Sequence, residues 1–325
     1  MGKLRAGIFG VGSCLPEKVV TNEDLSKMVD TSDEWITERT GIKERRVTNY
    51  ETSTSDLALA AAELALEDAH MDPGELDLIL VGTCTPDMLF PSTACILQDR
   101  LQAKNAKAFD LSAACSGFNY CLATVSSFVA SEMFKNILVV GADTLTKYVD
   151  WSDRSTCVLF GDGAGAAVIK ATSDGSGILS NYLITEGGGG KHLIMPGGGS
   201  RDPEMKHGRF IKMNGKEVFK FAVRSLEESI IESLKQANLN IKDIDLLIPH
   251  QANIRIIDHA IKKLNLPKEK VYVNLHKYGN TSAASIPIAL DEAVKKSKIK
   301  KGDIVILSGF GAGLTCGANV IKWSK

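Results

Sequence analysis

The chain has few of the features that mark secreted, metal-binding or membrane proteins. Its seven cysteines are an odd number and include no C-x-x-C pair, so the sequence indicates neither a disulfide framework nor a zinc site. None of its six histidines lies in a pattern such as H-E-x-x-H, and we expect no metal. No hydrophobic run approaches the roughly 20 residues that span a bilayer, and the N-terminal residues do not resemble a secretory signal. We therefore expect a cytoplasmic protein.

The chain also has almost no excess of charge of either sign. Over 325 residues the formal net charge is −1, and the isoelectric point is about 6.6. Without a positive excess, the composition argues against binding to nucleic acid or to an anionic membrane. With 44% hydrophobic residues, the chain is long enough to bury one large core or two medium ones.

What the sequence does contain is an internal repeat. Residues 75–82 (ELDLILVG) resemble residues 243–250 (DIDLLIPH), 168 positions further on, and each stretch follows an amphipathic helical pattern. Residues 136–141 (NILVVG) likewise resemble residues 303–308 (DIVILS), at a separation of 167. The similarity of residues 160–165 (FGDGAG) to residues 310–315 (FGAGLT), at 150, places an extra segment in the first copy. The chain therefore contains two copies of one α/β unit.

This repeat predicts the architecture. Each copy alternates helices with buried strands, which is typical of a mixed sheet with helices on its faces. Pairing the copies predicts a duplicated five-layered αβαβα sandwich, with an N-terminal half at 1–172 and a C-terminal half at 173–325. The glycine clusters at 187–190 and 197–199 predict a mobile loop over residues 186–207, which would suit a gate over a pocket.

One cysteine stands where enzymes place nucleophiles. Residues 111–118 read LSAACSGF, with a strand-like run before them and a helical pattern from Phe118 to Met133 after them. Cys115 should therefore lie near a helix N-terminus, where backbone N–H groups and the helix dipole lower the pKa of a thiol. The same N–H groups can receive the oxyanion that forms on a thioester during acyl transfer. Taken alone, the motif favours a small buried cysteine instead.

Two polar residues follow in the second copy. His250 ends a predicted strand, and the helix predicted from Asn253 to Leu264 begins beside it, which favours an uncharged imidazole. Asn280 lies in a turn that leads into another helix. Each residue alone is also typical of a structural role, a hydrogen-bonded histidine and a helix N-cap respectively.

Together these segments resemble the Cys-His-Asn triad of the β-ketoacyl-acyl-carrier-protein synthase III family, and the resemblance extends over nearly the whole chain. The triad segments are ACS at 114–116, PHQAN at 249–253 and GNTS at 279–282; further motifs are SDEWI at 32–36, RTGI at 39–42, FPS at 90–92, FGDGAGA at 160–166, EVFK at 217–220 and GFGAG at 309–313. The resemblance implies a thiolase-like fold, in agreement with the sandwich expected from the repeat.

The resemblance implies the initiating condensation of type II fatty acid synthesis. A short acyl group passes from coenzyme A to Cys115, and malonyl carried on acyl carrier protein then attacks it with loss of carbon dioxide. His250 and Asn280 would stabilise the enolate that decarboxylation produces. The backbone N–H groups of Cys115 and Ala312 would form an oxyanion hole. Coenzyme A thioester is a substrate here, and we expect no cofactor.

Binding residues are also implied, position by position. For coenzyme A they are Trp35 and Arg154 around the adenine, Arg39 near the phosphates, and Gly215, Phe219, Ala252 and Asn253 along the pantetheine tunnel. The acyl pocket would be shaped by Leu145, Phe310 and a Phe90 contributed across a homodimer interface. A basic patch of Lys220, Arg255, Lys262 and Lys263 would dock the carrier protein.

The sequence departs from the family pattern at three positions. Lys216 stands where Asn is common, Ala312 replaces a frequent glycine, and Cys316 replaces Trp in Leu-Thr-Trp-Gly. Because thiolases carry a second catalytic cysteine near their C-terminus, Cys316 makes a non-decarboxylating thiolase an alternative, although we interpret it as a small core residue. A polyketide-type starter synthase remains open, because it would share the fold and the triad. A catalytically inactive scaffold of the same fold is a third reading, against which the complete triad argues.

Overall fold

Two mixed β-sheets of the same design form the centre of the molecule. The computed structural model describes residues 4–325. The first sheet has the order β1-β7-β6-β4-β5, and the second has the order β8-β13-β12-β11. An isolated bridge between Leu247 and Val271 continues the second sheet at the place where the first has β5. The strands of the sheets are β1 (Arg5–Cys14), β4 (Leu78–Gly82), β5 (Lys107–Leu111), β6 (Asn136–Thr144), β7 (Asp162–Thr172), β8 (Gly177–Thr185), β11 (Leu246–Pro249), β12 (Ile304–Gly311) and β13 (Thr315–Lys322).

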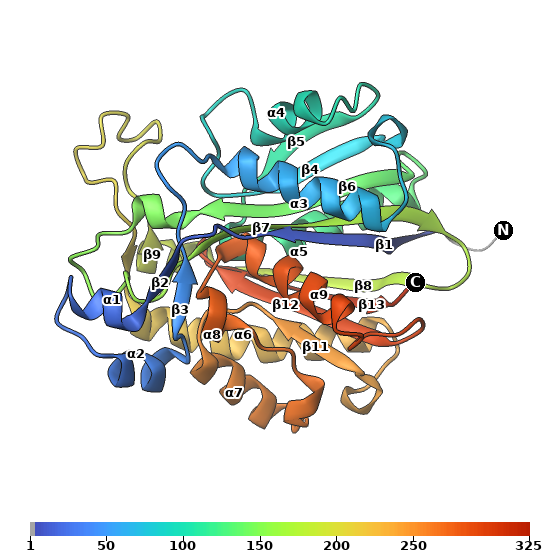
Figure 1. The fold of residues 1–325 in the computed structure, drawn as a ribbon. Helices are drawn as coiled ribbons and strands as arrows, with labels where there is room; N and C mark the ends of the chain where they lie inside the picture. The colour runs from blue at the N-terminus through green and yellow to red at the C-terminus, as the bar shows by residue number, and fades with distance from the viewer. Residues whose placement is uncertain (1–3) are drawn as a thin grey trace.

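Helices complete the five layers, which Figure 1 shows edge on. Helices α3 (Thr54–Asp68) and α4 (Thr93–Arg100) cover the outer face of the first sheet. Helices α6 (Gly215–Gln236) and α7 (Ile254–Lys263) lie outside the second sheet, and α5 (Gly117–Ala130) and α9 (Ser285–Lys295) lie between the two sheets. The duplicated αβαβα sandwich expected from the repeat is therefore confirmed.

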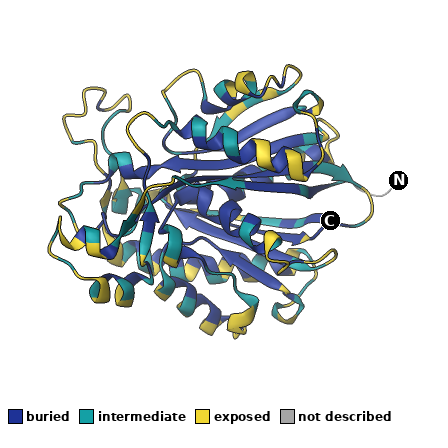
Figure 2. Cartoon of the chain, viewed as in Figure 1, coloured by how far each residue is buried: buried dark blue, intermediate teal, exposed yellow. Residues whose placement is uncertain are grey.

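The sequences of the helices explain which layer each occupies. An outer helix needs one apolar face, and α6 buries Phe221, Leu226 and Ile230 while its other face stays exposed. The middle helices contact sheets on both sides, and they are apolar over most of their circumference: α9 buries every residue from Ser285 to Leu290. Figure 2 shows this central layer and the strands around it as the most buried part of the molecule.

The two halves share a hydrophobic core. One hydrophobic cluster contains residues of both halves, such as Leu80 from β4 and Leu307 from β12. The division at residue 172 falls between β7 and β8 and stays a prediction. No helix among residues 4–325 is both long and apolar enough to cross a membrane.

The remaining elements are short. They are β2 (Val19–Thr21), α1 (Asn22–Ser26), α2 (Asp33–Thr40), β3 (Glu44–Arg46), β9 (Leu193–Ile194), β10 (Lys212–Met213), α8 (Leu275–Tyr278) and the 3-10 helices η1 (Pro73–Glu75), η2 (Ala114–Ser116), η3 (Leu145–Tyr148), η4 (Gly187–His192), η5 (Ile241–Asp243), η6 (Lys268–Lys270) and η7 (Ser282–Ala284).

Candidate active site

Two matching turns meet where the halves join. The 3-10 helix η2 leads into α5 and carries Cys115, and η7 leads into α9 at the equivalent place in the second half. Each begins with a non-glycine residue in the left-handed region, Ala114 at φ 46° and Ser282 at φ 52°. Such backbone strain is typical of functional sites, where the surrounding structure holds it in place. The repeat therefore extends to the two turns, which we call the η2 turn and the η7 turn.

Each turn packs against a strand of the opposite half, and glycines make the approach possible. A Cβ atom on Gly141 of β6 would lie 2.3 Å from the carbonyl oxygen of Ala283 in the η7 turn. A Cβ atom on Gly311 of β12 would lie 2.7 Å from the backbone nitrogen of Cys115 in the η2 turn. No side chain fits at either position, because the nearest atoms belong to backbone that cannot easily move.

The Cys115 thiol is buried at this junction, with 7% of the residue exposed. The hydroxyl of Ser282 donates a hydrogen bond to Cys115 Sγ over 3.4 Å. Burial raises the pKa of the thiol to about 12, and the hydrogen bond from Ser282 opposes that increase only in part. The expectation that the helix start would lower this pKa is therefore wrong for the free enzyme, because removal from water disfavours the thiolate more strongly.

Asn280 is held by both halves. Its backbone N–H donates to Leu159 O at 2.8 Å, and its carbonyl accepts from Gly161 N at 2.9 Å, so a first-half segment braces this second-half residue. Its side-chain Oδ1 accepts a hydrogen bond from the backbone N–H of Ser282 at 2.9 Å. That contact directs the amide NH₂ of Asn280 away from Ser282 and leaves it as the donor end.

His250 follows β11, and only 1% of it is exposed. Burial lowers the pKa of the imidazole to about 3, which keeps it neutral, as expected from the sequence. Its Nδ1 lies 2.6 Å from Ser285 Oγ, and the same oxygen accepts from Gln251 N at 3.3 Å. Because Ser285 Oγ already accepts one hydrogen bond, its own proton can go to Nδ1, and this favours the tautomer with Nε2 protonated.

A cavity of about 320 Å³ opens beside Cys115. Ser282 and Leu145 line it, but Phe310, His250 and Asn280 are not among its lining residues. Phe310 instead packs edge-on against His250, with ring centroids 5.1 Å apart. Segment 193–195 of the predicted loop also lines the cavity. The lining residues are Cys84, Ser112, Ala113, Ala114, Cys115, Leu145, Phe160, Leu193, Ile194, Met195, Ile211, Ser282, Ala312, Gly313 and Thr315.

The second thiol at the cavity is Cys84, which sequence reasoning missed. Cys84 Sγ lies 3.9 Å from Ser282 Oγ and 3.4 Å from Asp143 Oδ1. Burial raises the pKa of Cys84 well above its ordinary value. Cys316, by contrast, is fully buried in the second core with its sulfur 3.5 Å from Ser229 Oγ, and it does not line the cavity.

Four of the residues expected to bind coenzyme A are joined by contacts around α2, namely Trp35, Arg39, Arg154 and Asn253. The guanidinium carbons of Arg39 and Arg154 lie 4.7 and 5.0 Å from the Trp35 ring centroid, so Arg154 stacks on the ring where adenine was expected. Asn253 caps α7 and donates from Nδ2 to Arg39 O at 3.1 Å. Ala252 is buried beside it, while Gly215 and Phe219 lie in the first two turns of α6.

The basic residues expected to dock a carrier protein are exposed. Arg255, Lys262 and Lys263 lie outside the buried face of α7, which is formed by isoleucines and Ala260. Lys220 on α6 is also exposed and pairs with Glu217 at 2.7 Å.

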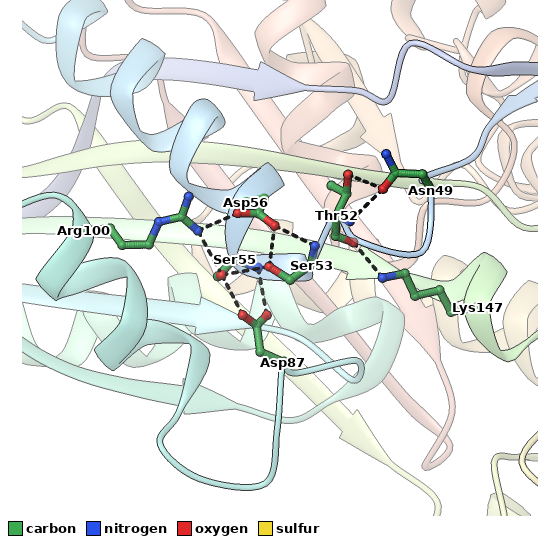
Figure 3. Close-up of polar contacts among 8 residues, drawn as sticks. All are labelled: Asn49, Thr52, Ser53, Ser55, Asp56, Asp87, Arg100 and Lys147. Carbon is green, nitrogen blue, oxygen red and sulfur yellow. Dashed lines mark hydrogen bonds and ion pairs between the residues drawn. The ribbon is translucent and has the colours of Figure 1, made fainter.

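Phe90 belongs to the segment between β4 and α4, which polar contacts of Asp87 anchor at its base; Figure 3 shows these contacts. Asp87 accepts hydrogen bonds from the backbone N–H and the hydroxyl of Ser55, at 2.9 and 2.6 Å, at the start of α3. Arg100 donates to Ser55 Oγ at 3.2 Å and to Asp56 at 2.8 Å. The tip beyond this anchor is open, and 83% of Phe90 is exposed.

The fold and the buried thiol at the junction of two repeats define a thiolase-like condensing enzyme. Comparisons with known proteins agree. Residues 109–187 match the family described as 3-oxoacyl-[acyl-carrier-protein (ACP)] synthase III, and residues 234–323 match the description of its C-terminal part. A relative from Caldanaerobacter subterraneus subsp. tengcongensis, named β-ketoacyl-[acyl-carrier-protein] synthase III, is 59% identical over 99% of each chain. The chain belongs to the β-ketoacyl-acyl-carrier-protein synthase III family.

Solved structures support the same assignment. The crystal structure of 3-oxoacyl-[acyl-carrier-protein] synthase III from Aquifex aeolicus has a TM-score of 0.93 at 52% identity, covering 98% of this chain and 100% of that one. The priming β-ketosynthase of the R1128 polyketide pathway has a TM-score of 0.94 at 36% identity, covering 100% of this chain and 98% of that one. The protein is thus an acyl-transferring condensing enzyme of the kind that initiates fatty acid synthesis.

Proposed function

We propose that the enzyme condenses a short acyl-coenzyme A with malonyl-acyl carrier protein through an acyl group on Cys115. The observation that carries this proposal is the junction itself: a thiol from one half meets Ser282, whose backbone orients Asn280 of the other half. We assign to this site one nucleophile, Cys115, and two neutral donors, His250 and Asn280, and such a set can form an acyl-enzyme and then stabilise an enolate.

In the first step the Cys115 thiolate attacks the acyl carbonyl of the coenzyme A thioester. The new bond joins Sγ to the carbonyl carbon, the bond to the coenzyme A sulfur breaks, and the proton lost by Cys115 ends on the departing thiol. The backbone N–H groups of Cys115 and Ala312 receive the oxyanion in this proposal. Both residues line the cavity, and Gly311 lies against the Cys115 nitrogen, which supports that role.

In the second step malonyl-acyl carrier protein loses carbon dioxide. The electron pair of the broken carbon–carbon bond becomes an enolate, whose oxygen accepts hydrogen bonds from His250 Nε2 and the Asn280 amide. Both groups are neutral, so they stabilise the charge as it develops without binding the malonyl carboxylate tightly. The enolate carbon then attacks the acyl group, and Cys115 leaves to give the β-ketoacyl product.

Coenzyme A enters, in this proposal, past Trp35, Arg39 and Arg154 and along Gly215, Phe219, Ala252 and Asn253. The hydrogen bond from Asn253 to the Arg39 carbonyl ties the two groups together and supports a single route. Because Arg154 stacks on Trp35, the adenine has to displace the guanidinium or bind beside the pair. Malonyl-acyl carrier protein docks at Lys220, Arg255, Lys262 and Lys263, whose exposed positive charges suit an acidic partner.

The working unit is proposed to be a homodimer in the cytoplasm. Strand β5 is at the open edge of the first sheet, and Phe109 on it is 39% exposed. Leu89 and Phe90, at 78% and 83% exposed, form an apolar tip that a monomer would leave in water. A second copy that covers this tip would receive Phe90 at its acyl pocket, beside Leu145.

A polyketide starter synthase is the second candidate, favoured by the likeness to the R1128 priming enzyme. The two functions differ in the starter that the cavity accepts, and one methylene changes such selection by only about 10- to 200-fold. Higher identity to fatty acid enzymes supports the first function.

Intact-protein mass spectrometry tests the proposal. The enzyme is mixed with acetyl-, isobutyryl- or hexanoyl-coenzyme A and then chased with malonyl-acyl carrier protein. We expect an adduct on Cys115 that the chase discharges as β-ketoacyl product, with one starter preferred. Discharge only to coenzyme A or acetyl-coenzyme A would favour a thiolase, and absence of any adduct would overturn the proposal.

A further inference from the structure

Ser282 contacts both the Cys115 thiol of the first half and the Asn280 amide of the second half. It is fully buried, it lines the cavity, and it holds the strained φ of 52°. Its side chain and its backbone contact different groups: the hydroxyl contacts Cys115, and the N–H contacts Asn280. The sequence motif at 279–282 contains Ser282, but no role for it follows from the motif.

The direction of the hydroxyl proton follows from its neighbours. Cys84 lies 3.4 Å from Asp143 Oδ1, a carboxylate oxygen that can only accept from it, so the Cys84 proton has an acceptor there. Cys84 Sγ can then only accept from Ser282, over 3.9 Å, and Cys115 Sγ at 3.4 Å is the nearer acceptor for the Ser282 proton. When Cys115 is a thiolate it can only accept, and Ser282 becomes the donor that stabilises it.

Asp143 holds this arrangement from the first half. The carboxylate is fully buried, and its Oδ1 accepts hydrogen bonds from the backbone N–H groups of Cys84 and Thr85, at 2.8 and 3.1 Å. Its Oδ2 accepts from the backbone N–H of Ala283 at 3.2 Å. One carboxylate therefore fixes both the Cys84 segment and the η7 turn, and Ser282 has little freedom to turn away from Cys115.

We propose that Ser282 is a positioning residue that acts on the two half-reactions through two different groups. Its hydroxyl stabilises the Cys115 thiolate for acylation, and its backbone N–H orients the Asn280 amide for decarboxylation. This inference rests on the proposed function, because it assigns a further residue to that same reaction.

The contact of Ser282 with Cys115 uses its side chain, and the contact with Asn280 uses its backbone. A substitution can therefore remove the first contact and keep the second. Ser282→Ala removes the hydroxyl and keeps the N–H, so acylation by acetyl-coenzyme A should slow about 10- to 100-fold at neutral pH, as for loss of a hydrogen bond to a charged group. The pH profile of acylation should shift to higher pH by a corresponding amount. Decarboxylation limits the discharge of pre-acylated enzyme by malonyl-acyl carrier protein in this proposal, so discharge should change less than about threefold, because the contact to Asn280 remains.

Two further variants control for folding and strain. Ser282→Gly also lacks the hydroxyl but adopts a positive φ easily, so it should reproduce the acylation defect even if Ser282→Ala folds poorly. Ser229→Ala removes another buried serine hydroxyl beside a cysteine sulfur, that of Cys316, outside the cavity, and acylation should be unchanged.

Alkylation of Cys115 by iodoacetamide, followed by peptide mass spectrometry against pH, reports the thiolate without any acyl substrate. The alkylation profile should also move to higher pH in Ser282→Ala and Ser282→Gly. If the wild-type enzyme forms no acyl adduct, the proposed function fails. If it does, and both variants match it in acylation and in alkylation at every pH, the role of Ser282 is overturned.

Discussion

The η2 turn and the η7 turn have the same backbone arrangement but carry different side chains. Both are short 3-10 helices that start with a left-handed residue, precede a buried helix of the middle layer and contact a strand of the opposite half. In the η2 turn the second residue is Cys115, and in the η7 turn the second residue is Ala283. The donor that we assign to the second half is instead Asn280, just before the turn.

The comparison shows how duplication produces an asymmetric site. Two copies of one strained turn meet at a pseudo-symmetric junction, and each brings backbone and side chains close to the other. Only the η2 turn carries the thiol, and the η7 turn provides a hydrogen-bond donor to it: Ser282 donates to Cys115 across the junction. The packing that holds both turns in their strained conformation also keeps the two sets of groups aligned.

Removing the Cys115 thiol should have the largest effect, because the thiol is the chemical feature of the η2 turn that the η7 turn lacks. Cys115→Ala should abolish acyl-enzyme formation, since the thiol that we propose as the nucleophile is lost. Intact-protein mass spectrometry with acetyl-coenzyme A measures this. Cys316→Ala is the matched control, a buried thiol outside the cavity, and it should still be acylated. Loss of condensation with the adduct retained in Cys316→Ala would instead favour the thiolase reading.

Removing the donor of the second half should affect only the later step. Asn280→Ala should leave acylation of Cys115 largely intact and slow condensation about 100- to 1,000-fold, as expected for one lost donor to a developing oxyanion. Rapid-quench measurement of each half-reaction separates the two. Asn274→Ala is a matched buried asparagine that contacts Glu292, and both half-reactions should persist in it. Equal loss of both steps in Asn280→Ala would contradict the division between the turns.

The pH profiles of the two steps should differ. Burial raises the pKa of Cys115 to about 12, so the thiolate fraction, and with it acylation, should rise about tenfold for each pH unit between 6 and 9. Burial lowers the pKa of His250 to about 3, so His250 stays neutral throughout this range and condensation of pre-acylated enzyme should be nearly flat. Stopped-flow or rapid-quench assays at constant ionic strength test this, and parallel profiles would be the contrary result.

The glycines that let the turns approach should give the smallest and most local effects. Gly141→Ala and Gly311→Ala each place a Cβ atom against backbone, and each should lower the free energy of unfolding by about 1–3 kcal/mol, measured in urea. In the folded variants, Gly141→Ala should mainly slow condensation and Gly311→Ala mainly acylation. Gly199→Ala, with nothing within 4 Å of its Cβ, is the control and should be neutral. Identical kinetic defects in Gly141→Ala and Gly311→Ala would mean that the junction acts as one unit.

The helices that carry the candidate site residues were predictable from the sequence. The helix predicted after Cys115 is α5, and Asn253 caps α7 where the second predicted helix begins. The roles of Cys84 and Asp143 were not predictable, because neither lies in a motif and their importance comes from contacts across the fold. Phe310 was expected in the acyl pocket, yet it packs on His250 because alternate residues of β12 point to opposite faces of the sheet.

By itself the sequence determined the α/β class, the duplication and the position of the thiol at a helix start, because periodicity, turn residues and repeats are local properties that a chain displays directly. Only the tertiary structure decided what surrounds that thiol. Ser282 reaches Cys115 from 167 positions away, and the direction of the thiol's pKa shift depends on how completely the two halves exclude water. Desolvation is a property of the packed junction, and no segment carries it alone.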